Sequence, residues 1–505
     1  MAVVLARALS GTLFGLDGVR IDVEANIAPG LPGFHIVGLT DRVLQEARER
    51  VKIAINNSGV EFPGQKVTVN LAPAQVPKEG SAFDLAIAAA ILSASADQPL
   101  PEGAAFLGEL GLDGSVRRVR GVLPIAAHLS RSGAACFYVP CDNVAEARLG
   151  TTRPVHPVRD LRQLVDHWES GNGLAAAETP PAGEPRLVEP AVDLADVRGQ
   201  ATARRALEIS AAGGHHILLI GPPGAGKTLL ARAMPGILPA LTPDESLEVT
   251  AIASCVGLLP PGSGLIVQPP IRAPHHNISA AGLVGGGGAT PRPGEITRAH
   301  HGVLFMDEFT EFRRDALEAL RQPLEEGRVA VARVGGHAVF PGRFILVAAA
   351  NPCGCGFAGD SGQRCRCSPL ELQRYRARLS GPVRDRIDLQ VTVPRQPAAS
   401  LLRPSDPVEA SAAVRIRVLD ARSRQCARRP GGPLNGALTG PQLRRDARLD
   451  EAGHALLETA ADRLHLTGRG IHRVLRVART IADLEAAAAI APAHIAEALQ
   501  YREPA

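Results

Sequence analysis

Residues 221–228 combine residue types and a spacing that could bind phosphate groups. They read Gly-Pro-Pro-Gly-Ala-Gly-Lys-Thr, a complete G-x-x-x-x-G-K-[ST] pattern. In this pattern the backbone N–H groups of a glycine-rich turn surround phosphate oxygens, the lysine reaches the β- and γ-phosphates, and the hydroxyl contacts Mg²⁺. The expected nucleotide-binding residues are Gly221, Pro222, Pro223, Gly224, Ala225, Gly226, Lys227 and Thr228.

The lysine of this loop stands out from the composition of the chain. There are four lysines against fifty-one arginines, and Lys227 is the only lysine after position 78. Lysine carries a compact point charge, which suits contact with β- and γ-phosphates. Residues 215–220 predict a buried strand before the loop, and residues 228–233 predict the start of a helix after it. This is the context that a phosphate loop needs, because the helix N-terminus also faces the phosphates.

Two further apolar strands end in polar residues that could support hydrolysis. Residues 302–306 are followed by Asp307 and Glu308. Asp307 would hold Mg²⁺ directly or through water, and Glu308 would polarise the attacking water. Residues 344–350 predict another strand, which ends at Asn351. The Asn351 amide could orient the water against the γ-phosphate, or the residue could simply form a turn.

Six tracts carry a resemblance to a known family: residues 272–279, 293–296, 302–308, 351–356, 379–388 and 478–484. Together with the N-terminal region, they make nearly the whole chain similar to the ComM/YifB family of magnesium-chelatase-like AAA+ ATPases. In this family a Lon-protease-like domain precedes a ChlI-like ATPase domain. The resemblance implies hydrolysis of ATP with Mg²⁺ by a homo-hexameric ring, and it places Asn351 at the sensor-1 position.

The resemblance also implies roles for three arginines. Arg386 matches the arginine finger, which reaches the γ-phosphate of a neighbouring subunit and typically accelerates hydrolysis by about 10³–10⁵. Arg469 matches the sensor-2 arginine of a C-terminal lid domain, and Arg473, one turn later, is the neighbouring candidate. The alternative is that Arg469 and Arg473 are surface arginines of the lid.

A hairpin and an arginine-rich segment bear on the substrate. Residues 328–340 have the pattern of a β-hairpin. Such hairpins line the central pore of related AAA+ motors, so Arg333 and His337 are candidate substrate contacts, or equally ordinary hairpin residues. Residues 403–480 hold 15 arginines against 8 acidic residues, although the net charge of the chain is only +4. This surplus fits either contact with DNA or a solvated surface of ion pairs.

The family likeness implies a motor that remodels or translocates single-stranded or branched DNA, as a branch-migration helicase does. Two alternatives are a chaperone-like ATPase that remodels proteins and a metal-insertion ATPase of the magnesium-chelatase type. The chelatase ATPase subunit does not carry the Lon-like module, and nothing in this sequence indicates a tetrapyrrole pocket. We therefore expect DNA to be the partner of the ring.

Two C-x-C pairs lie nine residues apart, at Cys353, Cys355, Cys365 and Cys367. Four thiolates in a glycine- and arginine-rich loop could hold a structural Zn²⁺ ion with no open coordination position. Free or redox-active thiols are the alternative. The pairs at 275–276 and 300–301 are both His-His, but adjacent side chains diverge and we expect no carboxylate to complete a metal cluster. These are interpreted as loop histidines that contact substrate or backbone.

The N-terminal region resembles the Lon-protease-like domain, which has the ribosomal S5 domain 2 fold. Ser81 stands at the position of the protease nucleophile, but Pro124 occupies that of the lysine base, and no lysine occurs between positions 79 and 226. Since the serine needs this base, we expect no peptidase activity. Ser81 is instead interpreted as a helix N-cap with Asp84 at its N3 position. The module would then be a scaffold or a collar that guides the substrate.

The fold class expected from these patterns is α/β, with a P-loop AAA+ core, an N-terminal α+β module and a C-terminal helical lid. The eight cysteines of this long ATP-binding chain favour a reducing cytoplasm over a disulfide framework, and no run of 18 apolar residues predicts a membrane span. The expected divisions are residues 1–170 for the module, 171–190 for a linker, 191–395 for the ATPase core and 396–505 for the lid.

Overall fold

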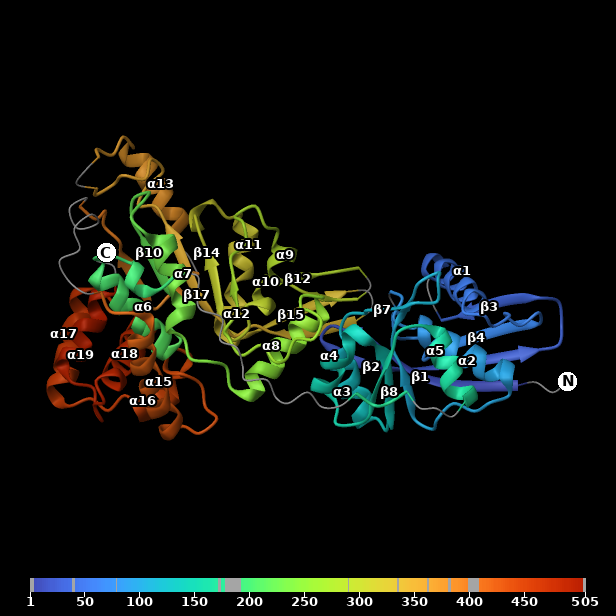
Figure 1. Ribbon diagram of the computed structural model, residues 1–505. Coiled ribbons are helices and arrows are strands. Elements are labelled where there is room, and N and C mark those ends of the chain that lie inside the picture. Colours follow the sequence, from blue (N-terminus) through green and yellow to red (C-terminus); the bar gives the residue numbers. More distant parts are fainter. Residues whose placement is uncertain are drawn as a thin grey trace.

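The computed structural model describes residues 4–38, 41–78, 80–170, 174–177, 192–288, 290–333, 336–360, 363–379, 383–397 and 408–502. The expected linker at 171–190 lies almost entirely outside these residues. Figure 1 shows an elongated molecule, with the elements of residues 4–170 at one end and those of residues 192–502 at the other. Among the described residues, no helix combines the length and the apolar character that crossing a bilayer requires.

A seven-stranded sheet with the order β3-β4-β2-β1-β5-β8-β9 forms the N-terminal part. β1 and β2 form a long antiparallel hairpin, β4 pairs antiparallel with β2, and the outer neighbours join in parallel. From Ile21 onward every second residue of β2 is buried, because alternate side chains of a strand point to the same face of the sheet. The strands are β1 Val4–Phe14, β2 Asp17–Ala28, β3 Gly33–Val37, β4 Lys66–Ala72, β5 Ala104–Phe106, β8 Cys136–Pro140 and β9 Val155–Val158.

The helices of this part pack on the sheet, beginning with α1, whose 17 residues have the spacing of an amphipathic helix. α2 is buried along nearly its whole length, because its Leu, Ile and Ala side chains fill the space against β1 and β2. A short ribbon of β6 Glu109–Leu110 and β7 Val116–Arg117 lies beside it. The helices are α1 Asp41–Asn57, α2 Asp84–Ala96, α3 Val122–Arg131, α4 Val144–Gly150 and α5 Leu161–Ser170.

The interpretation of Ser81 as an N-cap is wrong. α2 begins at Asp84, its N-cap is Phe83, and no side chain caps it. The Ser81 hydroxyl donates instead to the Glu109 carboxylate. The Asp84 carboxylate accepts from Arg50 Nε at 2.5 Å, because a carboxylate this deeply buried needs a charged partner. Burial raises the pKa of Asp84 to about 6 against the opposing effect of Arg50.

A five-stranded parallel sheet with the order β11-β14-β17-β10-β18 forms the middle of the chain. β14 and β17 are buried along their whole length, as expected where helices cover both faces of a parallel sheet. Because the strands are parallel, their carboxyl ends meet at one edge. The expected α/β class with a parallel sheet is confirmed. The strands are β10 Ile217–Ile220, β11 Ile271–Arg272, β14 Val303–Met306, β17 Ile345–Ala350 and β18 Leu389–Thr392.

Helices and short ribbons connect these strands. The predicted hairpin at 328–340 is present as β15 Arg328–Arg333 and β16 Gly336–Pro341. The other elements that bear on the site are α6 Ala201–Gly213, α7 Lys227–Ile237, α8 Pro243–Cys255, α9 Ala280–Val284, β12 Gly285–Gly286, β13 Arg292–Pro293, α10 Glu295–Arg298, η3 Phe309–Glu311, α11 Arg314–Ala319, α12 Arg321–Glu326, α13 Pro369–Leu379 and η4 Arg384–Arg386.

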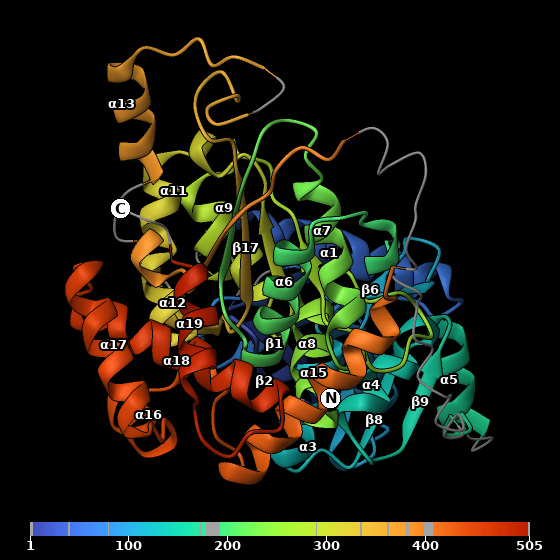
Figure 2. The same cartoon turned by 90° about the vertical axis from the view of Figure 1, so that its left-hand side faces the viewer.

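The C-terminal helices share a hydrophobic core with the parallel sheet. Val418, Val474 and Ile495 belong to the same buried cluster as Leu219 of β10. Figures 1 and 2 show these helices, coloured orange and red, at the opposite side of the parallel sheet from α13. They are α15 Ser411–Arg428, α16 Gly440–Asp446, α17 Glu451–Arg463, α18 Gly468–Leu484 and α19 Pro492–Gln500.

Much of the arginine surplus at 403–480 serves internal contacts. Arg422 donates to the carbonyl oxygen of Ala211, and Arg479 forms a buried ion pair with Asp483 at 2.9 Å. Others that bond carbonyl or carboxylate oxygens are Arg415, Arg417, Arg424, Arg428, Arg429, Arg473 and Arg476. The surplus therefore gives less support to a DNA-binding surface than its charge alone indicates.

Among the described residues, contacts between the N-terminal part and the rest of the chain include one at α8 and a second at the β15–β16 hairpin. The Ser254 hydroxyl at the end of α8 donates to the buried Glu146 carboxylate of α4 at 2.5 Å. At the second place the β1–β2 turn meets the hairpin: a Cβ atom at Gly336 would lie 2.8 Å from the Phe14 ring. Both contacts are close enough to fix the module against α8 and β16.

Candidate functional site

The phosphate loop joins β10 to α7, as its sequence predicts. Gly224 and Gly226 have φ angles of 76° and 95°, in the left-handed region that favours glycine. Around both positions, the described chain leaves the space for a Cβ atom empty within 4 Å. α7 begins at Lys227, so the helix N-terminus opens onto this concave turn. The loop thus has the shape and the backbone donors that a phosphate group needs.

Lys227 is brought to the strand that carries Asn351. Its Nζ atom donates to the carbonyl oxygens of Gly221 and Pro222 at 2.7 and 3.0 Å, and to Oδ1 of Asn351 at 3.2 Å. Burial lowers the pKa of Lys227, while the nearby Asp307 opposes that shift. The ammonium group therefore lies between the phosphate loop and the end of β17. The sequence predicts that Lys227 and Asn351 act at the same nucleotide, and this position brings them together.

The two expected Mg²⁺ ligands are in direct contact. The Thr228 hydroxyl donates to Oδ2 of Asp307 at 2.8 Å. The other oxygen of Asp307 accepts from the backbone N–H of Glu308 at 2.9 Å. A hydroxyl and a carboxylate side by side next to the phosphate loop are oxygen ligands of the kind that Mg²⁺ prefers, so these residues fit the ion.

Glu308 has a partner that the sequence analysis missed. Its Oε2 atom lies 3.1 Å from Nδ1 of His276. The backbone of Glu308 is left-handed, with φ of 51°, and its side chain is 56% exposed, so the carboxylate can reach solvent. His276 packs against His275 with ring centroids 4.1 Å apart. This contact is a pair between one histidine and one carboxylate, and it forms because the end of β14 lies beside the loop of His275 and His276.

Arg386 lies in η4 and forms an ion pair with Glu325 of α12 at 2.5 Å. Its side chain is only 12% exposed. Glu325 is itself half exposed and lies on α12, which follows β14 in the chain. The ion pair with Glu325 gives the Arg386 guanidinium a defined orientation.

The two lid arginines occupy different environments. Arg469 is exposed in the first turn of α18. Arg473 is buried, lies 3.8 Å from Asp385, and donates to the carbonyl oxygen of Ile387 at 3.4 Å. The structure therefore joins Arg473, rather than Arg469, to the segment that carries Arg386.

A buried hydrogen-bonded chain lies beside this contact. Nδ1 of His215 is 2.8 Å from Asp388, and Nε2 is 2.8 Å from the Thr480 hydroxyl. Burial favours a raised pKa for Asp388, but His215, Arg476 and His216 together outweigh burial and lower it. The chain links the start of β10 to the segment before β18 and to α18, so the C-terminal helices are held to the sheet by polar as well as apolar contacts.

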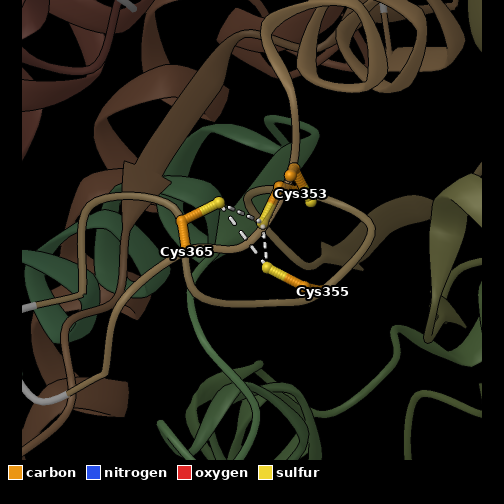
Figure 3. A group of neighbouring side chains, drawn as sticks. Cys353, Cys355 and Cys365 are labelled. Atoms are coloured by element: carbon orange, nitrogen blue, oxygen red, sulfur yellow. Dashed lines mark hydrogen bonds between the residues drawn. The ribbon is translucent and has the colours of Figure 1, made fainter.

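The four cysteines come together in one cluster (Figure 3), with their sulfur atoms all within 4.8 Å of one another. The Sγ atom of Cys353 lies 3.3 Å from that of Cys355 and 3.7 Å from that of Cys365. These separations are far longer than the S–S bond of about 2.0 Å in a disulfide. A tetrahedron with Zn–S bonds of about 2.3 Å has edges of about 3.8 Å, so the thiol arrangement fits a four-coordinate Zn²⁺ ion.

A second cluster brings a carboxylate to the other histidine pair. Glu248 Oε2 lies 2.9 Å from Nε2 of both His300 and His301, which corrects the expectation that none would do so. Nδ1 of His300 accepts from the backbone N–H of Arg343, so the proton of the neutral ring is on Nε2. Burial and the neighbouring His301 lower the pKa of His300 to about 4. With Nε2 protonated, this cluster is a hydrogen-bonded network and not a metal centre.

The hairpin presents one open face. Val331 and Phe340 lie on the buried face of the hairpin, whereas His337 and Val339 lie on its exposed face. Nε of Arg333 donates to the carbonyl oxygen of Gly287 at 3.2 Å. Residues 334–335, which connect the two strands, lie outside the described part of the chain. His337 is thus accessible to a substrate, while Arg333 is directed to the neighbouring loop.

Family models match three consecutive parts of the chain. Magnesium chelatase, subunit ChlI, matches residues 193–401; subunit ChlI of Mg-chelatase matches residues 23–143; and the C-terminal part of magnesium chelatase subunit ChlI matches residues 408–502.

Full-length relatives extend these matches. An uncharacterized protein of Mycobacterium tuberculosis is 47% identical over 503 residues, 99% of each chain. The uncharacterized protein YifB of Escherichia coli is 42% identical over 97% of this chain and 95% of its own. The competence protein ComM of Haemophilus influenzae is 40% identical over 99% of this chain and 97% of its own. The chain therefore belongs to the ComM/YifB family of magnesium-chelatase-like AAA+ ATPases.

Proposed function

We propose that this protein is a ring-forming motor that hydrolyses ATP with Mg²⁺ and remodels or translocates DNA. The observation that carries the hydrolytic part is the meeting of Lys227, Thr228, Asp307 and Asn351 at one edge of the parallel sheet. Lys227 and Thr228 lie on α7, the helix that follows β10, while Asp307 and Asn351 follow the ends of β14 and β17. Their convergence supports one catalytic site built on the phosphate loop.

In this proposal each side chain has a separate task. Lys227 releases its two loop carbonyls and moves its charge to the phosphate oxygens, while Thr228 and Asp307 hold Mg²⁺. The ion would supply the positive charge that stabilises the phosphoryl group during transfer. Glu308 accepts a proton from the attacking water, with His276 fixing the direction of its carboxylate. Asn351 orients that water through its amide.

We further propose that the active assembly is a homo-hexamer and that Arg386 acts on the nucleotide of the neighbouring subunit. Its low exposure and its ion pair with Glu325 support a pre-oriented guanidinium. Arg469 is the proposed sensor-2 arginine, because its exposure leaves it free to reach a nucleotide. Arg473 would then hold α18 to the segment around Arg386.

The remaining parts complete the proposed motor. Residues 1–170 would be an inactive Lon-like module of the S5 domain 2 type, residues 191–395 the ATPase core, and residues 396–505 the lid, with 171–190 as the linker. The four cysteines would hold a structural Zn²⁺ ion, and thiolate ligands favour a reducing cytoplasm as the place of action. His337 would face the substrate in the pore, and Arg333 would reach it only after releasing the carbonyl oxygen of Gly287.

DNA is the proposed substrate because a full-length relative is named a competence protein and because the hairpin leaves one face open. Protein remodelling is the alternative, and the exposed Val339 beside His337 favours it, since an apolar side chain can grip a polypeptide. A chelatase-type activity remains a third candidate on the family models alone.

The test is the ATPase rate of the full chain with no polymer, with single-stranded DNA, with a branched DNA and with an unfolded protein, each at two salt concentrations. DNA stimulation that weakens with salt is expected, because phosphate contacts release counterions. Stimulation by the unfolded protein alone would replace DNA with protein as the substrate. Hydrolysis unaffected by any polymer would contradict both.

A further inference from the structure

The loop that carries the four cysteines touches three parts of the nucleotide site. We name residues 353–360 and 363–367 the cysteine loop. It starts two positions after Asn351 and ends two positions before α13. Only Pro352 separates Asn351 from Cys353, so the cysteine cluster is linked closely to the end of β17.

The cysteine loop also rests on the phosphate loop. A Cβ atom added at Gly356 would lie 2.8 Å from Cδ and 2.9 Å from Cγ of Pro223. Gly356 also has a left-handed φ of 88°, so both its conformation and its surroundings require glycine. The backbone of the cysteine loop thus lies directly against the proline in the middle of the phosphate loop.

The third contact runs through α13 to the segment after Glu308. The Tyr375 hydroxyl lies 2.8 Å from Oγ1 of Thr310, and both side chains are buried. Thr310 lies in η3, two positions after Glu308. Through α13, the cysteine loop is therefore connected to the catalytic strand β14 as well as to β10 and β17.

The sulfur cluster is the main cross-link within this loop, and the buried side chain of Asp360 also forms an ion pair with Arg395 at 3.8 Å. The described residues between Asn351 and α13 form no helix or strand, and Cys353 is the one cysteine among the four that is fully buried. Its Sγ atom accepts from the backbone N–H of Ala358 at 3.2 Å, which closes the first turn of the loop around it. A loop without a core of its own needs cross-links, and a four-thiolate metal site supplies them.

We propose that metal occupancy of the four-cysteine site controls the nucleotide site: with Zn²⁺ bound, the cysteine loop presses on Pro223 and fixes Asn351, and without it the phosphate loop loses its support. The inference rests on the proposed nucleotide and zinc sites, and it adds a regulatory role to what would otherwise be a structural ion. It predicts that loss of zinc makes the phosphate loop more mobile, which faster hydrogen exchange at residues 221–228 would show.

The first experiment measures how zinc content affects the mobility of the phosphate loop, with no nucleotide present. The full chain is prepared with Zn²⁺ and again after dialysis against a chelator with a thiol reductant, and the metal is counted by mass spectrometry. Hydrogen exchange of a peptide spanning 221–228 is expected to be about tenfold faster in the metal-free protein. Exchange in α2 serves as the internal control and is expected to stay unchanged.

Two glycine variants separate the contact from the metal. Gly356→Ala is expected to keep one Zn²⁺ per chain but to weaken binding of a fluorescent ATP analogue by about tenfold, because the added methyl group meets Pro223. Gly354→Ala is the matched control in the same loop: its φ is not left-handed, and the described residues leave 4 Å around its Cβ position empty. It is expected to behave like the wild type.

Cysteine variants remove the metal and leave the glycine at the Pro223 contact unchanged. Cys365→Ser is expected to lose the ion and to reproduce the fast exchange at 221–228, whereas Cys426→Ser, at an exposed cysteine on α15, is expected to change neither. Absence of bound metal in the wild type would overturn the inference. So would a metal-free protein with unaltered exchange at 221–228.

Failure of the proposed function gives a different result. If the zinc-loaded wild type bound no ATP analogue, the ATPase proposal would fall, while the link between zinc content and exchange at 221–228 would still be measured. Conversely, if the protein hydrolyses ATP but hydrogen exchange at 221–228 is the same with and without zinc, only the regulatory role of the zinc site is excluded.

Discussion

The hydroxyl of Thr228 and the carboxylate of Asp307 lie 2.8 Å apart, although 79 positions separate them in the sequence. The parallel sheet brings them together, since β10 and β14 end at the same edge with β17 between them. A hydroxyl and a carboxylate meeting beside a phosphate loop support a shared contact with Mg²⁺.

Replacing Thr228 with Ala should raise the Mg²⁺ concentration that gives half-maximal ATPase activity by about tenfold, because one oxygen ligand is lost. Titration of phosphate release with Mg²⁺ measures the effect. Thr242→Ala, at the N-cap of α8, removes a hydroxyl that caps a helix and is the matched control. Equal Mg²⁺ requirements for wild type and Thr228→Ala would show that Thr228 does not act on the metal.

Glu308→Gln should reduce ATP turnover by about 10²–10⁴-fold, since an amide cannot accept the proton of the attacking water. Binding of a fluorescent ATP analogue should be retained, because Lys227 and the loop are intact. His276→Ala should lower kcat by a smaller factor with little change in KM, since His276 only directs Glu308. A variant Glu308→Gln that turns over at the wild-type rate would exclude this residue as the base.

Arg386→Ala should lower turnover by about 10³-fold while nucleotide binding persists. If the arginine acts across subunits, mixing it with Glu308→Gln should recover activity, because each variant supplies what the other lacks. Arg314→Ala, at an exposed arginine paired with Glu318, is the control. Mixtures no more active than the separate variants would place the arginine within its own subunit.

Acid should destabilise the fold between about pH 6.5 and pH 4 through His300. Its pKa is lowered to about 4 by burial and by His301, so in this window the unfolded chain binds a proton that the folded chain does not. Stability is therefore complete above pH 6.5 and falls with pH, by roughly 3 kcal/mol at most for this group. The partner Glu248, whose pKa is also lowered, adds to the loss in the same direction.

The thermal midpoint of unfolding, measured from pH 7 to pH 4 for the wild type and for His300→Gln, checks this. The variant should show a shallower fall, because glutamine does not titrate but can still bond Glu248 and the Arg343 N–H. Parallel curves for the two proteins would mean that His300 does not contribute to acid sensitivity.

The sequence predicts most of the nucleotide site because its motifs are local. The phosphate loop, the two acidic residues after β14 and Asn351 after β17 are each read from a strand and the few residues behind it. The approach of Lys227 to Asn351 follows from parallel strands ending at one edge. The partner of Glu308 could not be found this way, because His276 reaches it from a loop with no periodic pattern.

The errors have a similar origin. The Ser81 prediction relied on a local capping pattern, but Asp84 is drawn to Arg50, which lies on another helix. The arginine surplus at 403–480 resembles a binding surface by composition alone. In the fold many of these arginines bond carbonyl groups and carboxylates far away in the sequence, as Arg422 does with Ala211. Tertiary contacts of this kind join residues far apart in the chain, so no regular spacing in the sequence predicts them.

The central claim is that the site around Lys227 hydrolyses ATP. Phosphate release by the full chain with Mg²⁺ and ATP tests it most directly, in parallel with Lys227→Ala and with Lys52→Ala at an exposed lysine of α1. We expect steady release by the wild type and Lys52→Ala, and none above background by Lys227→Ala, which loses the charge that contacts the β- and γ-phosphates. Equal release by all three proteins would contradict the account.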